Sequence, residues 1–287
     1  FNNALQGMTL MSEQVRKIML DNGVSVPLAV SGVGVDHWER IASDGEPDLP
    51  ESRGFRFLHV SSCFPRKGAD VLLAAYGRAF RAEDDVTLVI KTFPNPHNEI
   101  YRWLEQARAS DAAFPHVVIL DEDYADAKLK ALYEHCQVLV APSRGEGFGL
   151  PMAEAMLSGL AVITTGWGGQ VDFCNSETAW LVDYRFEAAR THFGLFDSVW
   201  AEPDVAHLAR LMRELYELPA SARTERAAAG RRLLLERFRW SDVARRTVTV
   251  ARHWARTPEQ PKPRVGWVTT WGTRCGIAGY SAHLIRN

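Results

Sequence analysis

The chain has 287 residues, 46% of them apolar, which is enough for one large domain or two. Its 33 basic and 35 acidic side chains give a formal net charge of -2, so the charge balance excludes a chain-wide attraction to nucleic acid or to an anionic bilayer. No apolar run approaches the roughly 18 residues that span a membrane. Four widely spaced cysteines show no metal or redox pairing and favour a reducing, cytoplasmic location.

The N-terminal segment predicts the end of one domain and a linker. Residues 12–36 have the pattern of a helix, a short strand and a glycine-rich turn, and a polar, proline-containing stretch follows up to Arg53. The first residues, FNNALQGM, resemble no signal peptide and lack a start methionine. We therefore interpret residues 1–45 as the end of a preceding domain plus a linker, and expect the rest of that N-terminal domain to be missing from this chain.

Strand-like and helical patterns alternate through the central part of the chain. Apolar runs predict strands at 55–62, 86–93, 116–120, 137–143, 160–165 and 179–183. Helical patterns lie between them and continue afterwards, at 68–80, 98–110, 127–136, 151–158, 204–218, 221–238 and 241–256, the last with Ser241 as its N-cap. Most strands are too apolar for a sheet covered on one side. The predicted fold class is α/β, a Rossmann-like doubly wound parallel sheet over residues 46–255.

The C-terminal residues have the pattern of the start of another α/β unit. A proline-rich stretch, TPEQPKPR, precedes a strand-like run and a glycine-rich turn. We interpret residues 256–287 as a linker and the start of a further Rossmann-like unit.

The stretch APSRGEGFGLPMAEAMLSGLAVITT, residues 141–165, predicts an anion site. Ligands of open parallel sheets bind beyond the carboxyl ends of the strands, where residues 144–150 fall. Pro151 suits the first position of the following helix, whose free N–H groups and dipole favour an anion. Three glycines, Gly145, Gly147 and Gly149, would let the backbone approach that anion closely.

Two glutamates in the same stretch point to a ligand with hydroxyl groups. A carboxylate would repel a phosphate, whereas Glu146 and Glu154 suit hydroxyl donors on either side of one. A sugar nucleotide combines these groups. The alternative is that Glu154 only stabilises its helix dipole and Glu146 is a solvated loop residue.

A second basic turn, PRKG, follows the first predicted strand on the same edge. Lys67 and Arg66 could both bind a diphosphate, or they could form a solvated helix start. A third turn, residues 166–173, could add backbone N–H groups to the ligand.

Together these motifs resemble the C-terminal half of retaining glycosyltransferases of family 4, which have the GT-B fold. The resemblance covers residues 10–255, and its most specific part is the block with two glutamates eight positions apart. It implies that Glu146 contacts the donor sugar and Glu154 the ribose, that Lys67 binds phosphate, and that Glu146 and Lys67 are the catalytic candidates. It also implies that the backbone at Phe148, Gly149 and Leu150 contacts the diphosphate and the sugar, and Arg66 and Gly147 complete the predicted donor-binding residues.

The resemblance also implies the reaction. A hexosyl group would pass from a nucleoside diphosphate sugar, GDP- or UDP-linked, to a hydroxyl of a glycan or lipid-linked acceptor, with retention at the anomeric carbon, in polysaccharide or glycoconjugate synthesis. No cofactor and no metal are expected. Without its N-terminal domain, we expect the chain to bind donor without transferring sugar.

The sequence departs from the family at one position and leaves three weaker candidates. The family carries an arginine five positions before the lysine, where this chain has Ser62, and Arg66 is the candidate replacement. We interpret the acidic run 121–123 as a solvated turn rather than a metal site, and His59 as a core residue. The arginine-rich region 222–246 is either a solvated helix face or a patch for peripheral binding at the inner face of a membrane.

Two other classes of function remain open. The chain could be a non-catalytic nucleotide-sugar-binding module that regulates or scaffolds a transferase. It could also be an epimerase with the GT-B fold, whereas a nicotinamide enzyme would need a glycine fingerprint after a strand that this sequence lacks.

Overall fold

The computed structural model describes residues 5–47, 49, 52, 54–191 and 197–256. The chain forms two compact units, one made of residues 5–37 together with 234–256, and one made of residues 38–233. The predicted domain limits at 45 and 255 stay predictions, although the structure groups the last helix with the N-terminal segment. The unit expected within 256–287 lies outside the described residues.

The first unit contains the predicted helix and strand and one strand that the sequence did not reveal. Its elements are β1 (Met8–Leu10), α1 (Glu13–Asp21), β2 (Leu28–Val30) and α8 (Trp240–Ala255), and β1 pairs with β2 in parallel. Ser12 caps α1, because its hydroxyl accepts a hydrogen bond from Val15 N at 3.2 Å.

The start of α8 corrects one prediction. Ser241 lies inside the helix, and the N-cap position belongs to Arg239, which makes no side-chain cap. The Asp36 carboxylate, distant in sequence, accepts from Trp240 N at 2.7 Å instead. A local capping pattern misses this solution because the acceptor comes from another segment.

The second unit is built on a parallel sheet of six strands. The strands are β3 (Phe55–Val60), β4 (Val86–Thr92), β5 (Val117–Asp121), β6 (Val138–Ala141), β7 (Ala161–Thr165) and β8 (Trp180–Val182). Their order is β5-β4-β3-β6-β7-β8, and all the pairings are parallel. The order reverses between β3 and β6, so the loops after these two strands meet at the point where such sheets bind ligands.

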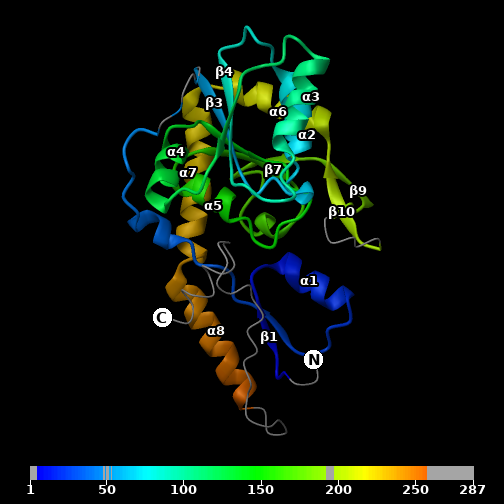
Figure 1. Cartoon of the computed structure of the whole chain (residues 1–287). Coiled ribbons are helices and arrows are strands. Elements are labelled where there is room, and N and C mark those ends of the chain that lie inside the picture. Colours follow the sequence, from blue (N-terminus) through cyan, green and yellow to red (C-terminus); the bar gives the residue numbers. More distant parts are fainter. Residues whose placement is uncertain (1–4, 48, 50–51, 53, 192–196, 257–287) are drawn as a thin grey trace. The chain divides into compact units, whose positions relative to one another are not determined.

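Helices cover both faces of this sheet, as predicted. They are α2 (Ala69–Ala79), α3 (Ile100–Ser110), α4 (Asp126–Glu134), α5 (Leu150–Leu157), α6 (Val205–Glu217) and α7 (Ala220–Arg237). In Figure 1, β3 and β4 lie between α4 and α7 on one side and α2 and α3 on the other. Every residue of β4 is buried, as expected for a central strand covered twice.

Three short helices and a two-stranded ribbon complete the second unit. The short 3-10 helices are η2 (Asp36–Arg40), which begins in the first unit, η3 (Pro65–Lys67) and η4 (Gly169–Asp172). Strands β9 (Tyr184–Ala188) and β10 (Val199–Pro203) pair antiparallel. The polar stretch predicted as a linker is packed against the second unit at its start. Trp38 in η2 is buried, and its indole N–H donates to the Ser158 hydroxyl at 2.8 Å.

Candidate functional site

The basic turn lies directly against the exit of the neighbouring strand. Helix η3 carries Arg66 and Lys67 between β3 and α2, and Gly68 follows with φ 70°. A Cβ at Gly68 would lie 2.1 Å from the carbonyl oxygen of Pro142, which leads out of β6. Only glycine fits there, because both the positive φ and the close approach exclude a side chain.

The glycine-rich loop passes into α5 through a second required glycine. Gly149 has φ 97°, and a Cβ there would lie 2.8 Å from Cβ of Gln170. Helix α5 begins at Leu150, one residue before the predicted start, so Pro151 occupies its second position. In the part of the chain that the structure describes, the N–H groups of Gly149 and Leu150 have no acceptor, and they remain available to an anion.

Lys67 and Glu146 form an ion pair at this edge of the sheet. Nζ of Lys67 lies 2.5 Å from Oε1 of Glu146, and the two side chains are 13% and 9% exposed. Arg66 is 43% exposed, lies 3.8 Å from Oε2 of Glu146 and donates to the Gly145 carbonyl at 3.0 Å. The structure therefore brings three of the predicted site residues into one cluster.

The two cations of this cluster stabilise the charge of Glu146, although burial and the like charge of Arg66 lower the pKa of Lys67. Burial alone would raise the pKa of Glu146, but the charges of Lys67 and Arg66 and hydrogen bonds from Lys67 and Ser143 outweigh it and hold the pKa below its usual range. Glu146 is therefore ionised at neutral pH. An anionic carboxylate accepts strongly from hydroxyl groups, the property expected of a sugar-binding group.

Glu154 has a different partner and a different charge state. Its Oε2 accepts from the Tyr133 hydroxyl of α4 at 3.1 Å. Burial raises the pKa of Glu154 to about 7, against the smaller effect of the Tyr133 hydrogen bond. Sequence reasoning placed Glu154 at the site but missed Tyr133, since nothing local links α4 to α5.

Arg144 connects three segments around the loop, a role that was not predicted. Its side chain is 6% exposed and donates to Glu202 (2.6 and 2.7 Å), Asp70 (2.8 and 2.8 Å) and the Pro65 carbonyl (2.5 Å). These bonds use all five N–H groups of the guanidinium. Arg144 therefore fixes the basic turn, the start of α2 and β10 relative to the glycine-rich loop.

Two further turns, at residues 166–173 and at Ser62, form hydrogen bonds near the glycine-rich loop and the basic turn. The third turn, which could add N–H groups to a ligand, uses one of them within the loop, since Gly169 N donates to the Glu146 carbonyl at 2.8 Å. Ser62, at the position of the family arginine, accepts from the Asn95 side chain through its carbonyl at 2.9 Å. Arg66 is thus the basic group beside Lys67 in this cluster, and its part in ligand binding stays a prediction.

The weaker candidates have structural explanations. His59 is buried, and its ring nitrogens lie 2.8 Å from the Val140 carbonyl and 2.8 Å from the Ser61 hydroxyl. Burial lowers the pKa of His59 to about 4, so the ring is neutral, as predicted for a core residue. Within the described ranges, no three acidic, histidine or cysteine side chains gather as they would around a metal ion, and residues 121–123 form no such group.

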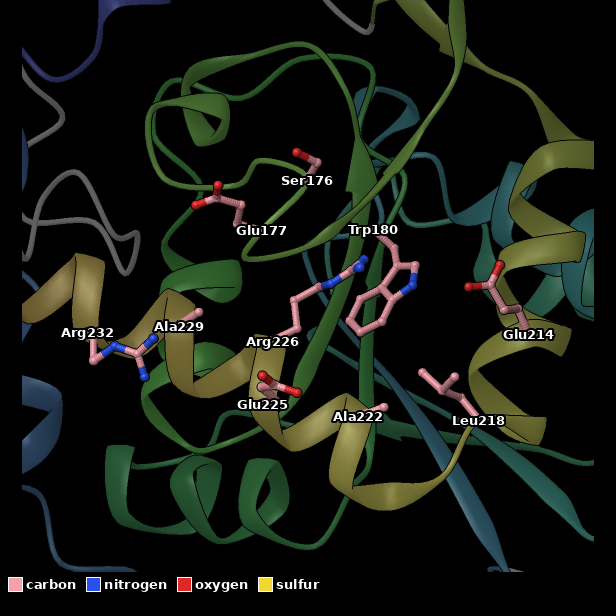
Figure 2. A pocket seen from close by; sticks show the side chains of 10 residues that line it. All are labelled: Ser176, Glu177, Trp180, Glu214, Leu218, Ala222, Glu225, Arg226, Ala229 and Arg232. Carbon is pink, nitrogen blue, oxygen red and sulfur yellow. The ribbon is translucent and has the colours of Figure 1, made fainter.

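Figure 2 shows a pocket elsewhere on the second unit, between α6, α7 and the segment before β8. Its side chains include Trp180, whose ring lies 4.0 Å from the Arg226 guanidinium. Trp180 starts β8, so this pocket lies at the amino edge of the sheet. The candidate site lies at the carboxyl edge, and the two are therefore distinct.

A parallel sheet with helices on both faces and two loops meeting at its switch point is the Rossmann-like architecture found in GT-B glycosyltransferases. One solved structure with this fold is Anabaena Alr3699/HepE in complex with UDP-glucose, at 17% identity and a TM-score of 0.66, over 86% of this chain and 64% of that one.

The sequence comparison assigns a family to the central part of the chain. Residues 54–191 match the family described as glycosyl transferases group 1. The chain is 30% identical over 244 residues to the MMP alpha-(1->4)-mannosyltransferase of Mycolicibacterium hassiacum, covering 85% of this chain and 53% of the relative. It is 26% identical to the glycogen synthase of Mycobacterium tuberculosis, over 89% of this chain and 55% of that protein. The chain thus spans about half the length of the curated relatives that it matches.

The structure tests whether any described helix could span a membrane. Among the helices of the described ranges, none combines the length and the apolar composition needed to cross a bilayer. The peripheral association weighed for residues 222–246 stays a prediction.

Proposed function

We propose that the carboxyl edge of the second unit binds a nucleoside diphosphate sugar, and that the protein transfers its hexosyl group to an acceptor hydroxyl with retention of the anomeric configuration. The observation that carries this proposal is the ion pair between Lys67 and Glu146 beside the start of α5. It places a cation and a helix N-terminus next to an ionised carboxylate. A diphosphate linked to a sugar needs both kinds of group within a few ångströms.

Each group has a distinct part in this reaction. The N–H groups at Gly149 and Leu150 and the ammonium of Lys67 stabilise the charge that develops on the leaving diphosphate. The carboxylate of Glu146 accepts from donor sugar hydroxyls and orients the ring. Glu154 lies on helix α5, which begins at Leu150, and its carboxyl group accepts from the ribose. The Tyr133 hydroxyl orients that carboxyl group by donating to one of its oxygens.

The names of the relatives support a hexosyl donor. One relative is a mannosyltransferase and another a glycogen synthase, and a solved structure of the same fold holds UDP-glucose. We propose a GDP- or UDP-hexose as donor and a glycan or lipid-linked hydroxyl as acceptor. The absence of a metal and of a resident cofactor from the reaction stays a prediction.

Calorimetry with the chain tests the binding step. We expect GDP or UDP, and the matching hexose nucleotide, to bind to the wild type and to bind at least tenfold more weakly to Lys67→Ala. Arg102→Ala, which changes an exposed cation on α3, is the matched control and should bind normally. Failure of both nucleotides and of their hexose derivatives to bind would contradict the proposal.

Transfer is tested separately in the full-length protein. We expect consumption of the nucleotide sugar only when a glycan acceptor is present, and a product whose anomeric configuration, read by NMR, matches that of the donor. Donor binding without any transfer in the full-length protein would favour the non-catalytic binding module instead.

A further inference from the structure

The connection between β8 and α6 is unusually long for this fold. It runs through residues 183–204 and contains the β9–β10 ribbon, whereas strand-to-helix connections in α/β units usually have about 2 to 6 residues. Because it leaves the carboxyl end of β8, it emerges at the edge of the sheet that carries the candidate site. Long connections at this edge commonly serve ligand binding.

One face of the ribbon is fastened to the glycine-rich loop. Side chains alternate between the faces of a strand, and on β10 the residues Trp200 and Glu202 share a face. Glu202 forms the ion pair with Arg144, and the Trp200 ring lies 4.7 Å from the same guanidinium. Ala201 N also donates to the Arg144 carbonyl at 3.2 Å. Because Glu146 lies only two residues after Arg144, the ribbon is also held in a fixed position relative to Glu146.

The opposite face of the ribbon presents aromatic rings. Phe186 is 58% exposed and Tyr184 is 38% exposed, and their ring centroids are 5.5 Å apart. Trp167, from the turn after β7, meets Phe186 edge-on at 5.7 Å. The Trp167 ring also lies 3.9 Å from the position of a Cβ on Gly145, the neighbour of Glu146. We call Trp167, Tyr184 and Phe186 the aromatic platform.

We propose that the aromatic platform binds a hexose unit of a neutral glycan, the acceptor or a growing chain, beside the donor sugar. This inference rests on the proposed function for the identity of the neighbouring ligand. The C–H face of a pyranose ring packs against an aromatic face, while its hydroxyls stay in water, so partly exposed rings suit it. A platform fixed beside Glu146 keeps an acceptor sugar within reach of the donor, as transfer requires.

The size of the platform favours a sugar over a protein partner. Its three rings and the adjacent Val199 expose on the order of 300 Å² in total, whereas a stable protein interface needs about 800 Å² on each side. The other face of the same strand is polar, since Arg185 and Glu187 form an exposed ion pair there, so the exposed aromatic surface of the ribbon is limited to the platform face. A single sugar ring or two can be covered by such a surface.

The experiment is saturation-transfer NMR on the full chain, with mannotetraose and maltotetraose as probes and the nucleotides measured in parallel. We expect at least one tetrasaccharide to bind the wild type in the millimolar range. Phe186→Ala and Trp167→Ala should each weaken that binding at least tenfold, and Phe186→Tyr, which keeps a ring, should retain it. Tyr101→Ala, which removes an exposed ring from α3, is the matched control and should bind like the wild type.

Nucleotide binding in the same samples separates the possible failures. Variants that keep nucleotide binding but lose the tetrasaccharide support the platform. Absence of tetrasaccharide binding to the wild type, or equal binding by all variants, overturns it. A change of oligomeric state in Phe186→Ala without a change in tetrasaccharide binding also overturns it, in favour of self-association. Loss of nucleotide binding alone would count against the proposed function and not against the platform.

Discussion

Two ion clusters start two residues apart in the same loop and differ in how fully their charges are satisfied. Arg144 donates all five of its N–H groups to Asp70, Glu202 and the Pro65 carbonyl. Lys67 has three N–H groups, and among the described residues its hydrogen-bond acceptor is Glu146. Arg144 therefore has no N–H group left to offer a ligand, whereas Lys67 retains bonding capacity.

The comparison gives a physical criterion for separating a structural charge from a functional one in a buried loop. Burial does not distinguish the two clusters, since Arg144, Lys67 and Glu146 all have exposed fractions below 15%. The clusters differ in the fraction of N–H groups on the cation that already have an acceptor. A saturated buried network rigidifies the fold, and a partly satisfied one marks a place where a ligand can complete it.

Removing Arg144 should have the largest effect on stability. Arg144→Ala leaves the carboxylates of Asp70 and Glu202 without their shared cation, which should lower the free energy of unfolding by about 3 to 5 kcal/mol. Arg144→Lys should recover only part of the loss, because an ammonium cannot form the two bidentate pairs. Urea unfolding measures both changes.

The control for Arg144 is Arg185→Ala. Arg185 also pairs with a glutamate, but its side chain is 79% exposed, and we expect no measurable change in unfolding. If Arg144→Ala unfolded at the same urea concentration as the wild type, the structural interpretation of this cluster would be wrong.

Glu154 provides a third case, a buried carboxyl with one neutral partner, and its effect depends on pH. Its folded pKa of about 7 lies above the ordinary value of 4.5, so the folded state holds the proton more tightly than the unfolded state. Its stabilising contribution is complete below pH 4.5 and declines as the pH rises towards 7, by up to about 3 kcal/mol. Urea unfolding between pH 4.5 and 8 should show this decline, and Glu154→Gln should lack it.

An equal pH dependence in wild type and Glu154→Gln would contradict the raised pKa. Tyr133→Phe offers a further check, because the Tyr133 hydroxyl stabilises the ionised form. Its removal should move the decline to higher pH.

Lys67 should matter for ligand affinity more than for rigidity. Lys67→Ala should weaken diphosphate binding by about 1.5 to 3 kcal/mol, the usual range for a hydrogen bond to a charged group. The loss should shrink as salt rises, because screening weakens the contribution of the cation. Calorimetry of GDP or UDP at two ionic strengths measures it, and a loss independent of salt would point to a packing defect instead.

Arg66 should have the smallest effect of the site residues. Its guanidinium is 43% exposed and already donates to the Gly145 carbonyl. If Arg66 replaces the arginine absent at position 62, Arg66→Ala should weaken diphosphate binding by roughly 0.2 to 1 kcal/mol. Unchanged affinity at low salt would show that Lys67 acts without it.

Much of the fold could be predicted from local patterns. The six sheet strands were each placed within three residues at either end, because their apolar runs are bounded by turn residues, and both faces of the sheet are covered as predicted. The positions of Lys67 and Glu146 on one edge followed from the parallel order alone. Ser241 failed as a cap because Asp36, far away in sequence, took its place.

What the sequence could not predict depends on contacts between distant segments. Arg144 stands in the glycine-rich loop like a phosphate-binding residue, and only the positions of Asp70 and Glu202 show that it is saturated. Tyr133 and the β9–β10 ribbon were missed for the same reason. The short ribbon strands carry mixed polar and aromatic residues without a strong local pattern, and β10 is held by contacts with Arg144, which is distant in sequence.

Calorimetry of a nucleoside diphosphate and its hexose derivative, on wild type, Glu146→Gln and Glu154→Gln, tests the central claim most directly. We predict that Glu154→Gln weakens both ligands, since both contain the ribose, and that Glu146→Gln weakens only the sugar nucleotide, with losses of about 1.5 to 3 kcal/mol. Equal losses for both ligands in both variants would contradict the assignment of the two glutamates to opposite ends of the donor.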